Sequence, residues 1–132
     1  VGSSDLEGSF DVAVPALAAV WLPEQDFTKY GPYDCYYAYS LTDRAGRTVG
    51  EGSVLFCAPK HFRFQDPGLT VRLEGDVAVV TASSYARSVE VQCGPDVLLE
   101  DNYFDINGGE RRVKILRGEA KDAAVRSVYD IR

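Results

Sequence analysis

Apolar and polar residues alternate in short stretches along most of the chain, with the two-residue period of a β-strand that has one buried face. The clearest example is residues 98–116, where Phe104 and Ile106 alternate with polar neighbours. The alternation resumes at Val113, after the run Asn-Gly-Gly at residues 107–109. Because asparagine and glycine accept a positive φ, this pattern predicts a β-hairpin that turns at 107–109.

Another hairpin is predicted nearer the N-terminus, over residues 34–57. Alternation marks two strands, at 34–42 and 48–57, and the residues between them form a loop that contains a glycine. Glycines stand on both sides of Glu51, and glycines inside a strand pattern indicate a bulge.

A third hairpin is predicted around the Gly-Asp pair at residues 75–76, with strands at 69–74 and 77–83. Glycine as the first loop residue favours a type II′ turn, and the second strand is expected to continue toward Cys93. A closing strand is predicted over 124–131. Many short strands separated by frequent turns are typical of an all-β sandwich.

Residues 15–23 admit two interpretations. The first is a short helix with Pro15 at its first position, which the local propensities favour. The second is a strand with Leu17, Ala19 and Trp21 on one face. We favour the strand, because all the clear elements that follow are strands.

The composition is that of an ordinary globular domain, with 45% hydrophobic and 26% charged residues in a chain of 132. The net charge of −6 leaves no excess of lysine and arginine to neutralise phosphates, which argues against a nucleic-acid partner. No apolar run approaches the roughly 20 residues that span a bilayer, so we expect no membrane association. Residues 1–7 lack a signal-peptide pattern and are interpreted as a linker or a cloning scar. The absence of methionine indicates a fragment of a longer chain.

The cysteines Cys35, Cys57 and Cys93 form no closely spaced pair, and His61 is the only histidine. Structural zinc sites need clustered ligands of these types, so we expect neither a metal nor a cofactor. An odd number of cysteines indicates a reducing compartment, so we expect a cytoplasmic protein with three free, mostly buried thiols, although the sequence leaves one disulfide open. No serine, cysteine or acid is placed by the sequence to complete a triad with His61, which is expected to be structural.

Oxygen-bearing side chains near residue 100 suggest a calcium site. Glu100, Asp101 and Asp105, together with Asn102, supply suitable ligands, but the spacing of a calcium-binding loop is absent. The favoured interpretation is that these side chains bond their own backbone in a turn. Arg87 shares its parity with apolar neighbours and is expected to be half-buried and paired with a carboxylate.

Aromatic residues between positions 21 and 39 suggest a carbohydrate-binding module that stacks its rings on sugars. Tyr30, Tyr33 and Tyr36 are the residues we expect to be exposed and to bind. Tyr37 and Tyr39 share their parity with apolar neighbours and are expected to pack inside. Packing is the favoured interpretation of the whole group, and binding is the alternative.

The run DNYFDINGGERRVKI at residues 101–115 resembles a stretch near the C-terminus of β-mannosidases, which are family-two glycoside hydrolases. The resemblance covers about residues 60–131. One departure is Ile106-Asn107-Gly108-Gly109, where a leucine and then a proline before the glycine are usual. Further matching pieces follow in the same order: residues 59–62, 66–67, 85–90 and 125–130.

The resemblance implies an immunoglobulin-like antiparallel β-sandwich that lies outside the catalytic barrel. The parent enzyme would be an exo-β-mannosidase that removes terminal non-reducing β-D-mannose by a retaining mechanism with two glutamates. No stretch of this chain matches those catalytic segments, so the chain is expected to carry no catalytic residue and to have a structural, domain-packing role. The expected partners are the remaining domains of the glycosidase, a second copy in a homodimer, and mannosides.

The expected domain organisation is a single immunoglobulin-like region over residues 8–132. Within it, residues 8–58 resemble the later strands of a preceding small sandwich, and residues 59–132 form the terminal sandwich.

Overall fold

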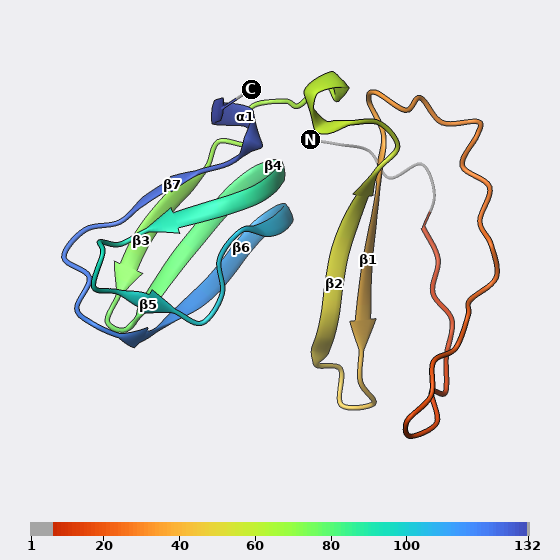
Figure 1. The fold of residues 1–132 in the computed structure, drawn as a ribbon, viewed down its shortest axis with the longest axis horizontal. Helices are drawn as coiled ribbons and strands as arrows, with labels where there is room; N and C mark the ends of the chain where they lie inside the picture. Colours follow the sequence, from red (N-terminus) through yellow and green to blue (C-terminus); the bar gives the residue numbers. More distant parts are fainter. Residues whose placement is uncertain (1–6, 132) are drawn as a thin grey trace.

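The computed structural model describes residues 7–131, and its strands form antiparallel pairs in two sheets (Figure 1). Apart from Glu7, the predicted linker at 1–7 lies outside the described residues. No helix within residues 7–131 is long and apolar enough to cross a membrane. In chain order the elements are β1 (Tyr36–Thr42), β2 (Thr48–Leu55), the 3₁₀ helix η1 (Pro59–His61), β3 (Thr70–Glu74), β4 (Val77–Gln92), β5 (Leu98–Leu99), β6 (Phe104–Arg117), β7 (Ala124–Arg126) and α1 (Val128–Ile131).

The larger sheet is built around β4, a strand of 16 residues. Its strand order is β3-β4-β6-β5, and β7 pairs with the last residues of β4. β6 follows β4 from the pair Val77–Lys114 to the pair Val89–Phe104, so both strands run the full length of the domain. β3 pairs with the first residues of β4 and β7 pairs with its last residues. The one strand β4 therefore contributes to both β-sheet layers of the sandwich.

Two irregularities bend β4 and β6 together. Ser83 and Ser84 of β4 lie opposite Gly108 alone, and Arg87 and Ser88 lie opposite Asp105 alone. Ser88 has a φ of +49°, which is unusual for a residue with a side chain. Each irregularity is therefore a β-bulge, and bulges increase the local twist and re-aim the side chains beside them.

The apolar core is formed by side chains from the strands of the larger sheet. Its central members include Ala78, Val80 and Val89 of β4, packed against Phe104 and Val113 of β6. Partly buried residues from 69 onward close its rim, and none of the described residues 7–68 belongs to it. The part of the chain after η1 therefore has a core of its own.

Val79 is fully buried but lies on the other face of the sheet, outside this core. Its partners across the strands are Arg72 of β3 and Arg112 of β6. Arg72 is 2.9 Å from Glu74 and 3.2 Å from Glu110, and Arg112 is 2.7 Å from Glu74. The arginine stems thus shield Val79 while their charged ends form an ion-pair network in solvent.

The predicted hairpin turn at residues 107–109 is wrong, because β6 runs through it without reversing. Gly108 and Gly109 do take positive φ values of +74° and +96°, but these values serve the bulge opposite Ser83. Since β4 offers a partner along the whole length of β6, the chain continues. The segment still pairs with itself, because β5 lies along the far end of β6.

Both interpretations of residues 15–23 are wrong, since this stretch is neither helix nor strand. Residues 7–35 run along the side of the β1–β2 hairpin away from the larger sheet (Figure 1). Most apolar side chains of this segment are exposed, with Trp21 at 97%, and Phe27 is an exception. Without a partner strand, the backbone of the segment has no ladder to join.

The predicted closing strand 124–131 is correct only at its start, because β7 is followed by the helical turn α1. Ser127 begins this turn: its hydroxyl accepts a bond from the Tyr129 N–H at 3.2 Å. In return, the Asp130 carboxylate accepts the Ser127 N–H at 2.7 Å. This reciprocal pair is a capping box, which the spacing Ser-x-x-Asp signals in the sequence.

The other two hairpins are confirmed. β1 and β2 pair as predicted, and their bulge lies next to Gly50, between Leu41 and Thr42 on the partner strand. β3 and β4 turn at Gly75, whose φ is +62°, and β4 continues past Ser83 as expected.

Candidate functional site

The DNYFD segment at residues 101–105 supports the fold around it. Asn102 precedes β6, and its side-chain amide pairs with the backbone of β4 as a neighbouring strand would. Its Oδ1 accepts the Val91 N–H at 2.8 Å, and its Nδ2 donates to the Val91 carbonyl at 3.0 Å. Tyr103 has a φ of +59° and donates its hydroxyl to Glu90 at 3.1 Å. Phe104 is buried in the core.

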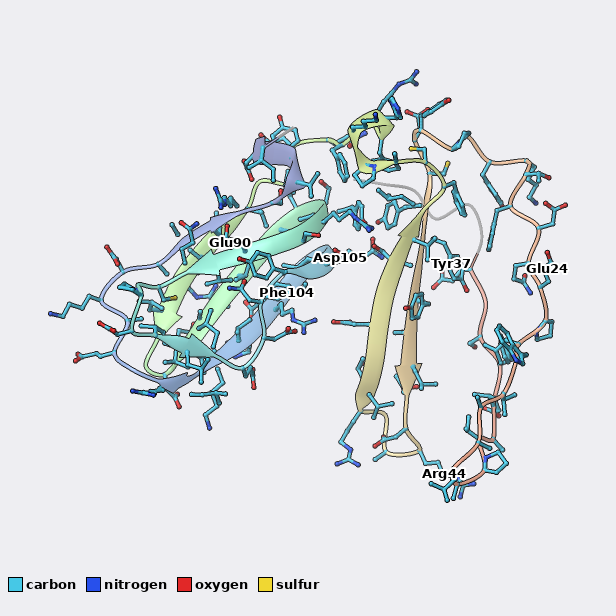
Figure 2. All side chains as sticks on the ribbon, viewed as in Figure 1. Glu24, Tyr37, Arg44, Glu90, Phe104 and Asp105 are labelled. Carbon is cyan, nitrogen blue, oxygen red and sulfur yellow. The ribbon has the colours of Figure 1, made fainter. Side chains whose placement is uncertain are left out.

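Asp105 lies at the end of the larger sheet that faces the β1–β2 hairpin (Figure 2). Its Oδ1 accepts the N–H of Ser88 at 2.8 Å, inside the second bulge. Its Oδ2 accepts the hydroxyl of Ser53 from β2 and lies 3.9 Å from Nη1 of Arg87. The expected half-buried pairing of Arg87 with a carboxylate is therefore confirmed.

Aromatic rings stack beside this carboxylate. The ring of Tyr36 from β1 lies 3.9 Å from that of Tyr85 from β4, with 14° between the planes. Phe62 and Phe64 pack around Tyr85, and the hydroxyl of Tyr85 lies 2.6 Å from that of Ser53. Burial raises the pKa of both stacked tyrosines, so their hydroxyls stay protonated and able to donate.

A charged contact completes the junction, which is the contact of the β1–β2 hairpin with β4 and β6. The Arg111 guanidinium bonds Glu51 of β2 and lies 2.5 Å from Asp101. It also lies 4.5 Å from the centroid of the Phe104 ring. Arg111 therefore joins the hairpin to the DNYFD segment and covers the edge of the core.

The opposite face of the hairpin carries a second aromatic group. Phe27 lies 5.0 Å from Tyr37 and 5.3 Å from Phe56, and Tyr37 stacks on Tyr39 at 6.3 Å. Figure 2 shows Tyr37 on the side of the hairpin away from Asp105. Tyr37 and Tyr39 are exposed, so the expectation that they pack inside is wrong. The reason is that no second layer covers this face of β1 in the described residues.

The three predicted sugar-binding tyrosines are not brought together. Tyr30 is half-buried and contacts Phe27, and Lys29 lies 5.0 Å above its ring. Tyr33 is 47% exposed. Tyr36 is also half-buried and belongs to the junction, so the expectation of exposure is wrong for Tyr30 and for Tyr36. A period of two predicted the two faces of β1 correctly, but not which face has a partner.

The carboxylates near residue 100 bind protein groups. Glu100 accepts the Lys114 N–H at 2.7 Å, and Asp101 accepts the Asn102 N–H at 2.9 Å as well as pairing with Arg111. Within residues 7–131 no group of three or more histidine, cysteine, aspartate or glutamate side chains could hold a metal ion. His61 lies exposed in η1.

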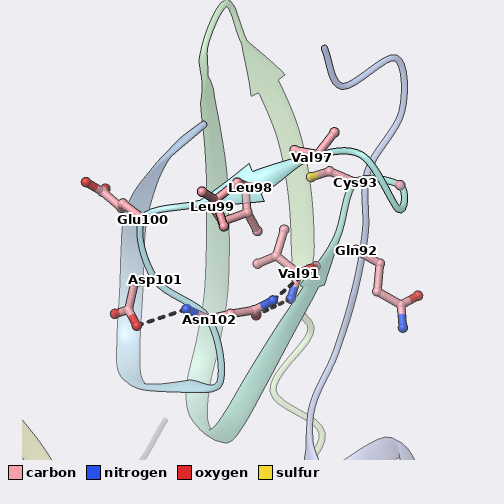
Figure 3. A pocket seen from close by; sticks show the side chains of 10 residues that line it. Val91, Gln92, Cys93, Val97, Leu98, Leu99, Glu100, Asp101 and Asn102 are labelled. Carbon is pink, nitrogen blue, oxygen red and sulfur yellow. Dashed lines mark hydrogen bonds between the residues drawn. The ribbon is translucent and has the colours of Figure 1, made fainter. Parts of the chain in front are cut away.

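A shallow pocket opens beside the DNYFD segment (Figure 3). Its apolar lining includes Val91, Val97 and Leu99, and Glu100 stands among its polar residues. Cys93 also borders it, but burial raises the pKa of this thiol, which disfavours the nucleophilic thiolate. Cys93 is therefore not prepared to act as a nucleophile.

Antiparallel strands in two layers around one apolar core define an immunoglobulin-like β-sandwich domain, which confirms the predicted fold class. A scan against family models matches the mannosidase family Ig_mannosidase, described as an Ig-fold domain, to residues 64–131, just over half of the chain. The chain therefore belongs to this family, and the predicted resemblance to an immunoglobulin-like domain of a mannosidase is confirmed. A search of curated proteins found no match to the chain. Membership supports an accessory role and implies further domains in the parent protein.

Proposed function

We propose that the chain is the non-catalytic C-terminal region of an exo-β-mannosidase that removes terminal non-reducing β-D-mannose residues. The family match to residues 64–131 carries this proposal. The contacts of the DNYFD segment support it, because its polar side chains bond neighbouring strands or the hairpin. Such a segment serves attachment and stability.

The same proposal divides the chain into two parts. Residues 59–132 form the terminal sandwich, and residues 8–58 are the remnant of a preceding small sandwich. The separate core after Leu69 supports this division. So do the exposed apolar side chains of Leu41, Val49 and Val54 on a hairpin that has no further strands among the described residues. An isolated two-stranded hairpin is only marginally stable, so other domains of the parent would cover it.

The test is a comparison of the full-length parent protein with this chain. The parent is expected to hydrolyse an aryl β-D-mannoside faster than the matching β-glucoside or β-galactoside, and this chain is expected to hydrolyse none of them. A parent without β-mannosidase activity, or turnover by this chain alone, would overturn the proposal. The three free cysteines support the cytoplasmic location that accompanies it.

A carbohydrate-binding module is the second candidate, in which Tyr33, the exposed member of the three tyrosines, stacks on mannosides. The exposed ring of Tyr33 favours it, because an accessible aromatic face can pack on the apolar face of a sugar. Titration with mannobiose should then shift the NMR signals of Tyr33, and Tyr33→Ala should abolish the shifts. Unchanged spectra would exclude this candidate. Association of two copies on addition of mannobiose would instead favour the expected homodimer.

A further inference from the structure

The two parts of the chain share only a small apolar contact. Among the residues that the structure describes, the core of the larger sheet contains none before Leu69. Where the hairpin meets it, Tyr36, Leu55 and Cys57 pack against the separate cluster of Phe62, Phe64 and Tyr85. Aliphatic packing is non-directional, so the orientation of the two parts depends on the ring stack of Tyr36 on Tyr85 and on polar bonds.

Directional contacts concentrate at the same place. Glu51 and Ser53 share one face of β2, and Tyr36 lies on the same face of the hairpin because it pairs with Leu55. Within residues 7–131, these three side chains make the polar bonds from β1 and β2 to the larger sheet. Their partners come from β4 and β6: Tyr36 with Asn107, Glu51 with Arg111, and Ser53 with Tyr85 and Asp105.

Asp105 connects the two sides through its two oxygens. Oδ1 accepts the N–H of Ser88, whose positive φ belongs to the bulge in β4. Oδ2 accepts the hydroxyl of Ser53 across the junction, and Arg87 stands 3.9 Å away. Because a carboxylate is planar and charged, its two acceptors bind in fixed directions and more strongly than neutral ones. Asp105 therefore links the bulge in β4 directly to Ser53 of the hairpin.

We propose that the face of β4 and β6 around Asp105 is the docking surface for the preceding hairpin, and that Asp105 is a positioning residue that sets the orientation of the terminal sandwich. The partner of this surface is the face of the hairpin that carries the hydroxyls of Tyr36 and Ser53 and one acidic residue, Glu51, opposite Arg111. Weakening these bonds frees the orientation and leaves each part folded.

The experiment uses the whole chain and removes bonds only from the hairpin side, so that the bulge in the larger sheet stays intact. The variant is Tyr36→Phe combined with Ser53→Ala. Its matched control is Tyr39→Phe combined with Ser40→Ala, because these residues are exposed on the same hairpin. Residual dipolar couplings are measured for the amides of β1 and β2 and for those of the larger sheet.

In the wild type and the control, one alignment tensor should fit both sets of couplings. In the Tyr36/Ser53 variant the common fit should be lost, and the couplings of the hairpin should shrink relative to those of the larger sheet. The amide exchange of β4 should stay unchanged. Asp105→Asn, which keeps the shape but removes the charge, should produce a smaller change in the same direction.

A common tensor retained in the Tyr36/Ser53 variant would overturn the proposal, and so would separate tensors in the wild type. Unfolding of the hairpin in this variant alone would also overturn it, because the bonds would then maintain the hairpin rather than its orientation. None of these outcomes bears on the mannosidase assignment, since no substrate is used.

Discussion

Val79 and Val80 are neighbours on β4 with the same burial, 0% exposed, but they should respond differently to truncation. Val80 faces the packed core, whereas Val79 lies beneath the stems of Arg72 and Arg112. Both substitutions to alanine remove the equivalent of two methylene groups, which is worth about 1.6 kcal/mol of transfer free energy.

The difference comes from the space that is left behind. A rigid core keeps a cavity of roughly 50 Å³, which adds about 1 kcal/mol at about 24 cal/mol per Å³. Flexible arginine stems can settle into the space above Val79, so most of this cavity term disappears there. We therefore expect Val80→Ala to lower the free energy of unfolding by about 2.5 kcal/mol and Val79→Ala by about 1.5 kcal/mol.

Urea unfolding followed by the amide NMR signals of β4 measures both values on the sheet in question. An unchanged slope of the free energy of unfolding against urea concentration would show that the substitution does not affect the unfolded state. Val54→Ala is the control, because its side chain is exposed on β2 and the loss should be below about 0.5 kcal/mol. Equal losses at Val79 and Val80, or a larger loss at Val79, would refute the view that the ion-pair network acts as a flexible cover.

Three further predictions concern single contacts. Asn102→Ala leaves one N–H and one carbonyl of β4 without their partner, so the free energy of unfolding should fall by about 2 kcal/mol in urea titrations. Gly109→Ala should lower the free energy of unfolding by about 1–2 kcal/mol through its positive φ alone. Gly118→Ala should lower it more, because its Cβ would collide with the backbone oxygen of Asp96; equal melting temperatures would contradict this. A hydrogen bond from Arg126 holds the pKa of Glu90 below its usual value. This bond therefore stabilises the folded state at pH values above the unfolded-state pKa of Glu90, and the stabilisation is lost as the pH falls through the folded-state pKa. NMR titration should find the Glu90 midpoint raised in Arg126→Ala, and an unchanged midpoint would contradict the pairing.

The hairpin predicted at residues 107–109 shows how a local signal can be correct and its consequence wrong. The glycines take the positive φ values that the sequence indicated. The buried residues before them are Phe104 and Ile106, and those after them are Val113 and Ile115, so the alternation shifts by one position. Such a shift is what a bulge in a continuous strand produces, and it was readable in the sequence. The partner that made the strand continuous, β4, was not.

The candidate site divides in the same way. The sequence singled out the DNYFD run, and Asn102 and Asp101 bond backbone groups as expected for these residues. It did not indicate that Ser53 would meet Asp105, because the two lie 52 positions apart and no local pattern connects them. It also placed Tyr36 in solvent, whereas its ring stacks on Tyr85.

By itself, the sequence determined the all-β class, two of the three hairpins and the family, because alternation, turn residues and motif residues act over a few neighbouring positions. Only the tertiary structure decided which face of each strand is covered, where β6 continues through its glycines, and how the hairpin meets the larger sheet. Those outcomes depend on partners that are distant along the chain, and burial is a property of both surfaces in a contact rather than of one segment.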